Sequence, residues 1–251
     1  MDRTVIVGDV HGCLEELQTL LRSCRYNPDC DRLVFVGDLL DRGPNPVGCL
    51  RLARGLGAEG VMGNHEEKHI RYHAHEQRKL RNPHYKNPVS SYDEDKLRQY
   101  RELRDDDFDF LRGWPPLLDL GKYGDRDYVV VHAGLEPAHT VENQNAGHVM
   151  RIRWVDKAGH YIPLEQGSLA RPENAAGRWS ERWNGSHDVI YGHAARSFAR
   201  PVVDQASKAH CYGIDTGCVF GGRLTAMTLP SRLFVQVPAR QAYVSATLDA
   251  A

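Results

Sequence analysis

Six side chains that can bind a divalent metal ion stand at intervals along the sequence. They supply carboxylate oxygens, one amide oxygen and imidazole nitrogens, and they belong to Asp9, His11, Asp38, Asn64, His132 and His193. This mixture of donors suits first-row divalent ions such as Mn, Fe, Co, Ni or Zn better than Ca or Mg. A structural zinc site is disfavoured because the set contains no cysteine. The donor types therefore predict a centre for such ions.

Short apolar runs are the elements that must position these donors. The runs cover residues 4–7, 33–36, 60–62, 128–131 and 189–191, and each donor lies just after one of them. Short apolar runs bounded by turn residues are typical of buried strands. Any one of these patterns alone is more often an ordinary turn, but five in one chain are hard to produce by chance. Because open α/β sheets bind ligands at the carboxyl ends of their strands, we expect the donors to meet there.

Helical periodicity separates the first three runs. Between residues 13 and 26, apolar residues recur at steps of three and four, which predicts an amphipathic helix. A second helix is expected to begin near Pro46 and to end at Gly55 or Gly57. The first 65 residues therefore predict a βαβαβ unit with a parallel sheet. Three short strands are expected near Gly213 and over residues 224–229 and 233–237.

The segment from residue 68 to about 113 is polar and predicts helices, so we expect one domain over residues 1–251 with a helical, cap-like insertion. Residues 68–86 contain six Lys or Arg and one acid. Either this is a solvated helical surface, or it is a cap that brings positive charge to a polyphosphate. The histidines of the segment are expected to be solvated, namely His69, His73, His75 and His84.

The composition is that of an ordinary globular protein. The chain has 251 residues, 41% hydrophobic and 26% charged, and a formal net charge of −1, which does not favour nucleic acid or an anionic membrane. No apolar run reaches the ~18–20 residues of a membrane span. A strand-like run begins near the N-terminus without a signal-peptide pattern, so a cytoplasmic location is expected. The six cysteines are then expected to be free thiols rather than disulfides.

Five blocks of the sequence resemble the signature of the phosphoprotein-phosphatase-type metallophosphoesterases, within the calcineurin-like superfamily. They are Gly8-Asp9-Val10-His11-Gly12, Gly37-Asp38-Leu39-Leu40-Asp41-Arg42-Gly43, Gly63-Asn64-His65-Glu66, His132-Ala133-Gly134 and Gly192-His193. Three later segments, Met150–Arg153, Tyr191–Ala194 and Ile214–Thr225, with a strand at 234–237, resemble the symmetrical diadenosine-tetraphosphatase branch. The resemblance implies an α/β fold: a mixed β-sheet sandwich flanked by helices, with the insertion at about 68–113.

The resemblance also implies a role for each residue of the centre. Asp9 and His11 would bind one metal ion, Asp38 would bridge two ions, and Asn64, His132 and His193 would bind the second. Mn is the expected ion at both positions, with Fe, Zn, Co or Ni as alternatives. The two ions would lower the pKa of a bridging water and bind the phosphoryl oxygens.

Four further residues complete the catalytic set that the resemblance implies. His65 would be the general acid and Asp41 would hold it through a carboxylate–imidazole bond. Arg42 and Arg151 would bind phosphoryl oxygens. A surface salt bridge is the alternative for Arg151, and Arg153 or Arg178 could then take its place.

The expected reaction is hydrolysis of a phosphoanhydride in a dinucleoside polyphosphate, such as diadenosine tetraphosphate to two ADP, or in a related RNA cap. Nucleic acid is thus expected only as a capped RNA. Phosphoprotein or broad phosphomonoester hydrolysis and endopolyphosphatase activity remain alternatives. A non-catalytic metal- or nucleotide-binding module is disfavoured, because binding alone needs no proton donor such as His65. Trp154, Trp179 and Trp183 could stack a base, although such residues are more often core. The sequence leaves the oligomeric state open.

Overall fold

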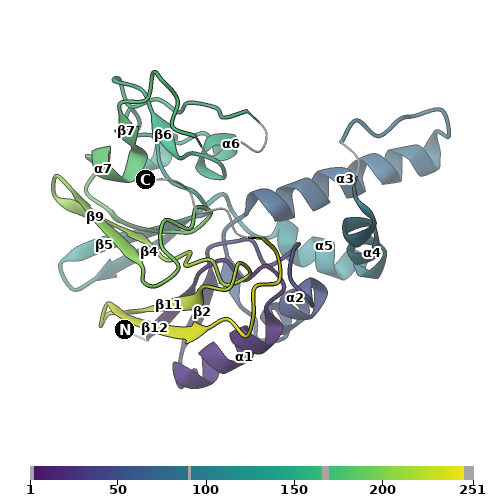
Figure 1. Ribbon diagram of the computed structural model, residues 1–251, viewed down its shortest axis with the longest axis horizontal. Helices are drawn as coiled ribbons and strands as arrows, with labels where there is room; N and C mark the ends of the chain where they lie inside the picture. Colours follow the sequence, from purple (N-terminus) through teal and green to yellow (C-terminus); the bar gives the residue numbers. More distant parts are fainter. Residues whose placement is uncertain (1–2, 90–91, 166–169, 246–251) are drawn as a thin grey trace.

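Two five-stranded mixed sheets face each other in the computed structural model, which describes residues 3–89, 92–165 and 170–245 (Figure 1). The first sheet has the order β12 (Leu233–Pro238), β11 (Arg223–Leu229), β1 (Thr4–Val7), β2 (Arg32–Phe35), β3 (Glu59–Gly60). The second has the order β4 (Leu117–Tyr123), β5 (Arg126–Val131), β8 (Asp188–Tyr191), β10 (Ala209–Gly213), β9 (Val202–Ala206). A small ribbon pairs β6 (Trp154–Val155) with β7 (Gly177–Arg178). The predicted α/β sandwich is confirmed.

The central strands are buried on both faces, which explains their unbroken apolar runs. Ile6 of β1 packs between the sheets with Val130 of β5 and Ile190 of β8. Its neighbours Val5 and Val7 point to the opposite face of their sheet, into the cluster that the helices cover. Because side chains alternate along a strand, one apolar run serves both layers.

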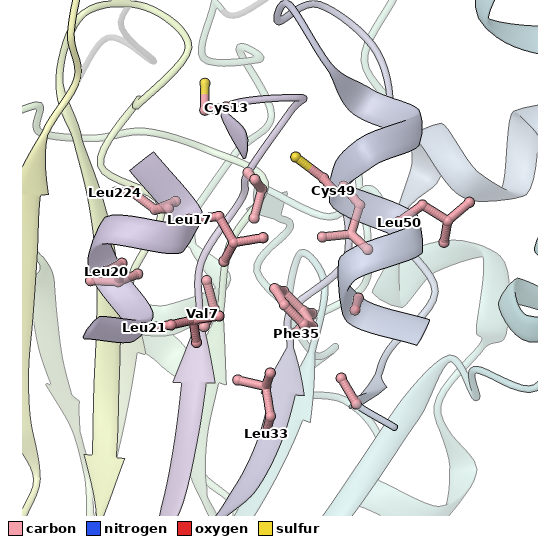
Figure 2. Packing of buried hydrophobic residues seen from close by; sticks show 14 of the residues in the cluster. Val7, Cys13, Leu17, Leu20, Leu21, Leu33, Phe35, Cys49, Leu50 and Leu224 are labelled. Carbon is pink, nitrogen blue, oxygen red and sulfur yellow. The ribbon is translucent and has the colours of Figure 1, made fainter. Parts of the chain in front are cut away.

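Two helices cover the outer face of the first sheet. They are α1 (Leu14–Ser23) and α2 (Pro46–Gly55). Leu17 and Leu20 of α1 and Leu50 of α2 pack with Phe35 in one cluster (Figure 2). Asn45 caps α2 by accepting a hydrogen bond of 2.9 Å from the N–H of Gly48. Since β1–β2 and β2–β3 are parallel, the predicted βαβαβ unit is confirmed.

Three helices occupy the region of the expected insertion: α3 (Asn64–Arg81), α4 (Glu94–Glu102) and α5 (Asp105–Arg112). Helix α3 extends away from the sandwich (Figure 1). The expectation that all four histidines are solvated was wrong for two of them, because His69 is 1% and His73 is 8% exposed. His73 stacks on Phe108 of α5 at 4.0 Å between ring centroids, so the inner face of α3 is packed.

The remaining segments complete the second layer. They include a 3₁₀ turn (Val141–Asn143), α6 (Ala146–Val149) and α7 (Trp179–Arg182).

Trp154, Trp179 and Trp183 are at most 3% exposed, so they are core residues and not a stacking surface. All six cysteines are free thiols. Within the described ranges, no helix is long and apolar enough to cross a membrane.

Candidate metal centre

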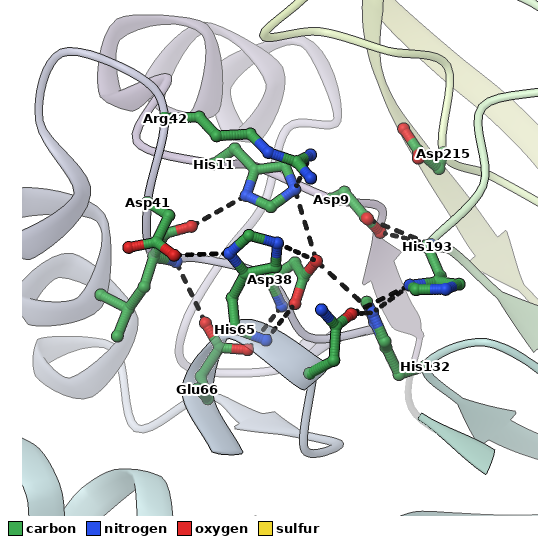
Figure 3. A network of polar contacts seen from close by, with 12 residues as sticks. Asp9, His11, Asp38, Asp41, Arg42, His65, Glu66, His132, His193 and Asp215 are labelled. Carbon is green, nitrogen blue, oxygen red and sulfur yellow. Dashed lines mark hydrogen bonds and ion pairs between the residues drawn. The ribbon is translucent and has the colours of Figure 1, made fainter. Parts of the chain in front are cut away.

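The predicted donors meet at the carboxyl ends of strands from both sheets (Figure 3). Asp9, Asp38 and Asn64 follow β1, β2 and β3 of the first sheet, and His132 and His193 follow β5 and β8 of the second. Oδ2 of Asp38 lies 3.4 Å from Nε2 of His132. Asp38 therefore follows a strand of the first sheet and faces a donor that follows a strand of the second.

Two buried histidines are set to receive a cation. Nδ1 of His11 lies 2.8 Å from the carbonyl oxygen of Leu40, and Nδ1 of His132 lies 2.8 Å from that of Val36. Nδ1 must donate its proton in both contacts, because a carbonyl oxygen only accepts. In the neutral rings Nε2 then carries a lone pair, and both Nε2 atoms face Oδ2 of Asp38, at 3.3 and 3.4 Å. Such convergent acceptors fit a metal ion.

A second cluster of acceptors surrounds Asn64. Its Oδ1 is 2.9 Å from Nε2 of His132 and 2.9 Å from Nδ1 of His193, and these two nitrogens are 3.1 Å apart. The Asp38 carboxylate outweighs the effect of burial on His132 and raises its pKa to about 9. Burial lowers the pKa of His193 well below its usual value. The raised pKa of His132 shows that the pocket attracts positive charge beside Asp38, whereas the lowered pKa of His193 keeps its imidazole neutral, with a lone pair for a divalent ion.

Asp9 lies next to these clusters and accepts the N–H of His193 at 3.1 and 3.0 Å. It is buried, and burial together with nearby Asp215 raises its pKa well above the usual value. A bound cation would offset both effects. Among the described residues, three groups have ligand atoms that lie within 4.8 Å of one another, and two of them are here, His11–Asp38–His65 and Asp38–His132–His193; the third, Glu136–His139–His160, shares no residue with them. Asp9 is outside the first two groups but adjoins them.

Tight backbone turns bring the donors together. His11, Asp38 and His193 have positive φ values of 44, 52 and 70°, in the left-handed region that costs a non-glycine residue energy. Two glycines make room for the carboxylates. A Cβ on Gly63 would lie 2.3 Å from Oδ1 of Asp38, and one on Gly192 would lie 2.0 Å from Oδ1 of Asp9.

Asp41 and His65 form the expected carboxylate–imidazole pair. Nδ1 of His65 lies 2.6 Å from Oδ2 of Asp41, so Nε2 points toward the centre, 3.8 Å from Oδ2 of Asp38. Two residues of the insertion also contact Asp41. These contacts were not predicted from the sequence. Nε2 of His69 lies 2.8 Å and Nζ of Lys96 lies 3.3 Å from its carboxylate. The spacing of four residues between His65 and His69 on one helix was the available signal.

Glu66 and Gln99 support the loop that carries Asp38 and Asp41. Neither residue was predicted from the sequence. The fully buried carboxylate of Glu66 accepts the N–H groups of Asp38 at 2.7 Å and Leu40 at 3.0 Å. Burial and the charge of Asp38 raise its pKa to about 7. Oε1 of Gln99 accepts the N–H of Asp41 at 3.1 Å. Glu66 belongs to the block Gly63-Asn64-His65-Glu66, which could have indicated its role. No local sequence pattern indicates that Gln99 contacts Asp41.

The two arginines expected to bind phosphate differ. Arg42 reaches the centre, with Nη1 2.7 Å from Nε2 of His11, and its guanidinium lies over the ring of Phe220 at 5.3 Å. Arg151 is bonded to Oε2 of Glu67 at 2.6 Å and to a backbone carbonyl at 3.1 Å. The ion pair with Glu67 is the kind of surface salt bridge that was the alternative role for Arg151. Arg153 lies close enough to His193 to lower its pKa, after the larger effect of burial.

Several known proteins are similar to this chain over most of its length. The family model for calcineurin-like phosphoesterases matches residues 2–214. The asymmetrical bis(5'-nucleosyl)-tetraphosphatase PrpE of Halalkalibacterium halodurans is 31% identical, covering 96% of this chain and 95% of its own. The symmetrical bis(5'-nucleosyl)-tetraphosphatase of Methylococcus capsulatus is 26% identical, covering 90% and 91%.

Two further comparisons add a protein phosphatase and a crystal structure. Serine/threonine-protein phosphatase 1 of Salmonella typhimurium is 31% identical, covering 88% of each chain. The crystal structure of a candidate diadenosine tetraphosphatase superposes with a TM-score of 0.71 at 28% identity, covering 95% of this chain and 94% of that one. The chain therefore belongs to the calcineurin-like phosphoesterase family and is a hydrolase.

Proposed function

We propose that this protein hydrolyses a phosphoanhydride bond of dinucleoside polyphosphates, at a centre of two divalent metal ions. The observation that carries this is the pair of donor groups around Asp38, set beside the His65–Asp41 pair. The relatives named as bis(5'-nucleosyl)-tetraphosphatases support the substrate class.

The metal ions would be held by Asp9 and His11 on one side of Asp38 and by Asn64, His132 and His193 on the other. When bound, such ions lower the pKa of a water molecule and neutralise phosphoryl oxygens. Mn is the proposed metal, because the mixed oxygen and nitrogen donors suit first-row ions.

The protein's own residues would supply orientation and a proton. Asp41 accepts the Nδ1 proton of His65 and so fixes the ring, which leaves Nε2 to deliver a proton to the leaving oxygen. Arg42 would bind the non-bridging oxygens of the phosphate under attack, since its guanidinium already reaches the ring of His11.

Product analysis tests the proposal. The protein is stripped with a chelator, reloaded with Mn, Co, Ni, Zn or Mg, and given diadenosine tetraphosphate, a capped RNA and inorganic polyphosphate. Symmetrical cleavage of diadenosine tetraphosphate yields only ADP, the outcome that we expect, whereas asymmetrical cleavage yields AMP and ATP. AMP with ATP would overturn the symmetrical mode alone. Absence of turnover of the dinucleotide with every metal would overturn the substrate class.

A phosphoprotein phosphatase is the second candidate, favoured by the similarity to the Salmonella typhimurium enzyme. The same metal centre would serve it. Comparing kcat/KM for phosphopeptides with kcat/KM for dinucleoside polyphosphates separates the two functions. A ratio in favour of the phosphopeptides would make this the function of the protein.

A further inference from the structure

We propose that the cavity between α4 and the C-terminal segment binds a nucleoside end of the substrate. This cavity has a volume of about 610 Å³, within the range of small-molecule sites in proteins. It begins at Asp41 and Arg42, beside the metal centre, and ends between α4 and residues 243–244. The proposal rests on the proposed function, because it names where that substrate's nucleoside would lie.

Charge is distributed along the cavity in a way that orients a nucleotide. Arg42 and Lys96 line the end near the centre, where Nζ of Lys96 is 3.3 Å from the carboxylate of Asp41. Four exposed residues form the outer rim, namely Asp93, Asp95, Arg98 and Glu102; Arg98 pairs with Asp95 at 2.9 Å, so the rim keeps a net negative charge. Cations at the inner end attract phosphates. Carboxylates at the rim repel phosphates but accept hydrogen bonds from ribose hydroxyl and base amino groups.

Tyr243 provides an aromatic wall for the base. Its hydroxyl donates to Oε1 of Glu16 at 2.8 Å, and its N–H donates to the carbonyl oxygen of Val219 at 2.9 Å. These bonds hold the half-buried ring in one orientation. A ring held in advance stacks on a base without losing further conformational freedom. Val244 lies next to it along the same wall.

Direct binding measurements test the cavity. ADP and inorganic pyrophosphate are titrated into the Mn-loaded protein by calorimetry, and the ratio of their dissociation constants reports the contribution of the nucleoside. We expect ADP to bind at least about tenfold more tightly than pyrophosphate, the scale of one stacked base. Val244→Trp fills the cavity and Tyr243→Ala removes its aromatic wall. Both changes should reduce the ratio toward one and leave pyrophosphate binding unchanged.

A matched control is Val203→Trp, because Val203 is 44% exposed on β9 and lies outside the cavity lining. This variant should keep the wild-type ratio. Equal affinity of the wild type for ADP and pyrophosphate would overturn the proposal, as would an unchanged ratio in both cavity variants. Failure of the proposed function shows separately, as absence of dinucleotide hydrolysis by the wild type.

Discussion

Asp41 shows how much a single buried carboxylate depends on its partners. It is 1% exposed and accepts bonds from the rings of His65 and His69, with Lys96 at 3.3 Å. Burial alone would raise its pKa, but the two histidines lower it below the usual value. The carboxylate thus stays ionised and holds His65 in the orientation that a proton donor needs.

Replacing His65 tests its role as the general acid. We expect His65→Asn to lower kcat for phenyl phosphate by ~10²-fold, the scale of general acid catalysis. The loss should be smaller for p-nitrophenyl phosphate, because its leaving oxygen needs less protonation. Metal content, measured by elemental analysis, should not change. His84→Asn, at an exposed position in the insertion, is the control. An equal loss for both substrates would contradict the role.

At the scale of elements, α4 is tied to the loop of Asp41 by the hydrogen bond to Gln99 and by the ion pair with Lys96. Gln99 is 6% exposed and accepts the N–H of Asp41, whose φ of 68° already places it in the left-handed region. The insertion therefore helps to shape the centre, whether it is a solvated helical surface or a cap that brings positive charge to the substrate.

Gln99→Leu should leave the N–H of Asp41 buried and without its acceptor. We expect the free energy of unfolding to fall by about 1–3 kcal/mol, the cost of an unsatisfied buried donor, and kcat to fall as well. Thermal unfolding and steady-state kinetics measure the two effects. Arg101→Leu is the matched control, because Arg101 is exposed on the same helix and lies outside the cavity lining. Loss of stability with unchanged kcat would mean that the bond is purely structural.

Another element-scale contact joins the segments before and after α6. The buried carboxylate of Glu136 accepts the N–H of Tyr161 at 2.8 Å and faces Nδ1 of His148 at 2.7 Å. Burial alone would raise the pKa of Glu136, but these two partners lower it. The stabilisation is thus complete above the unfolded pKa of about 4.3 and is lost as the pH falls through the lower, folded value.

The pH dependence of Glu136→Gln follows from this direction. At neutral pH the variant should have a lower Tm than the wild type, with a loss of about 1–3 kcal/mol in unfolding free energy. The difference in Tm should shrink below about pH 4, where both proteins lack the charge. Thermal unfolding followed by circular dichroism measures it. Glu173→Gln, at an exposed position, should show no such trend. A difference that grows on acidification would contradict the assignment.

At the scale of the whole molecule, the centre joins the two sheets of the sandwich. Asp9, Asp38 and Asn64 follow strands of one sheet, and His132 and His193 follow strands of the other. A metal ion bound by both sets would act as a cross-link between the layers. An ion that binds only the folded state stabilises it by ~2.7 kcal/mol at a hundred times its dissociation constant.

Removal of metal should therefore affect stability as well as activity. We expect treatment with a chelator to abolish hydrolysis and to lower Tm, and addition of Mn to restore both. Differential scanning calorimetry and an aryl phosphate assay measure these effects. In His193→Ala the Mn-dependent rise in Tm should be smaller than in the wild type. An identical Tm with and without Mn would mean that the ions do not bridge the sheets.

The sequence by itself determined the strands that precede the donors, the order of the donors and the turns that carry them. These features are local, because burial of a strand and the bend after it are encoded in adjacent residues such as Val7, Gly8 and Asp9. The family and its reaction class followed from the resemblance of the five sequence blocks that contain these donors.

Only the tertiary structure decided what surrounds those donors. His69, Gln99 and Lys96 reach Asp41 across 28, 58 and 55 positions of the chain, and the pairing of Arg151 with Glu67 spans 84. Such contacts depend on how helices pack, and the periodicity of a helix shows which face is apolar but not which residue of another element it will meet. For that reason the sequence predicts a solvated His69, whereas the structure shows it buried against the carboxylate of Asp41.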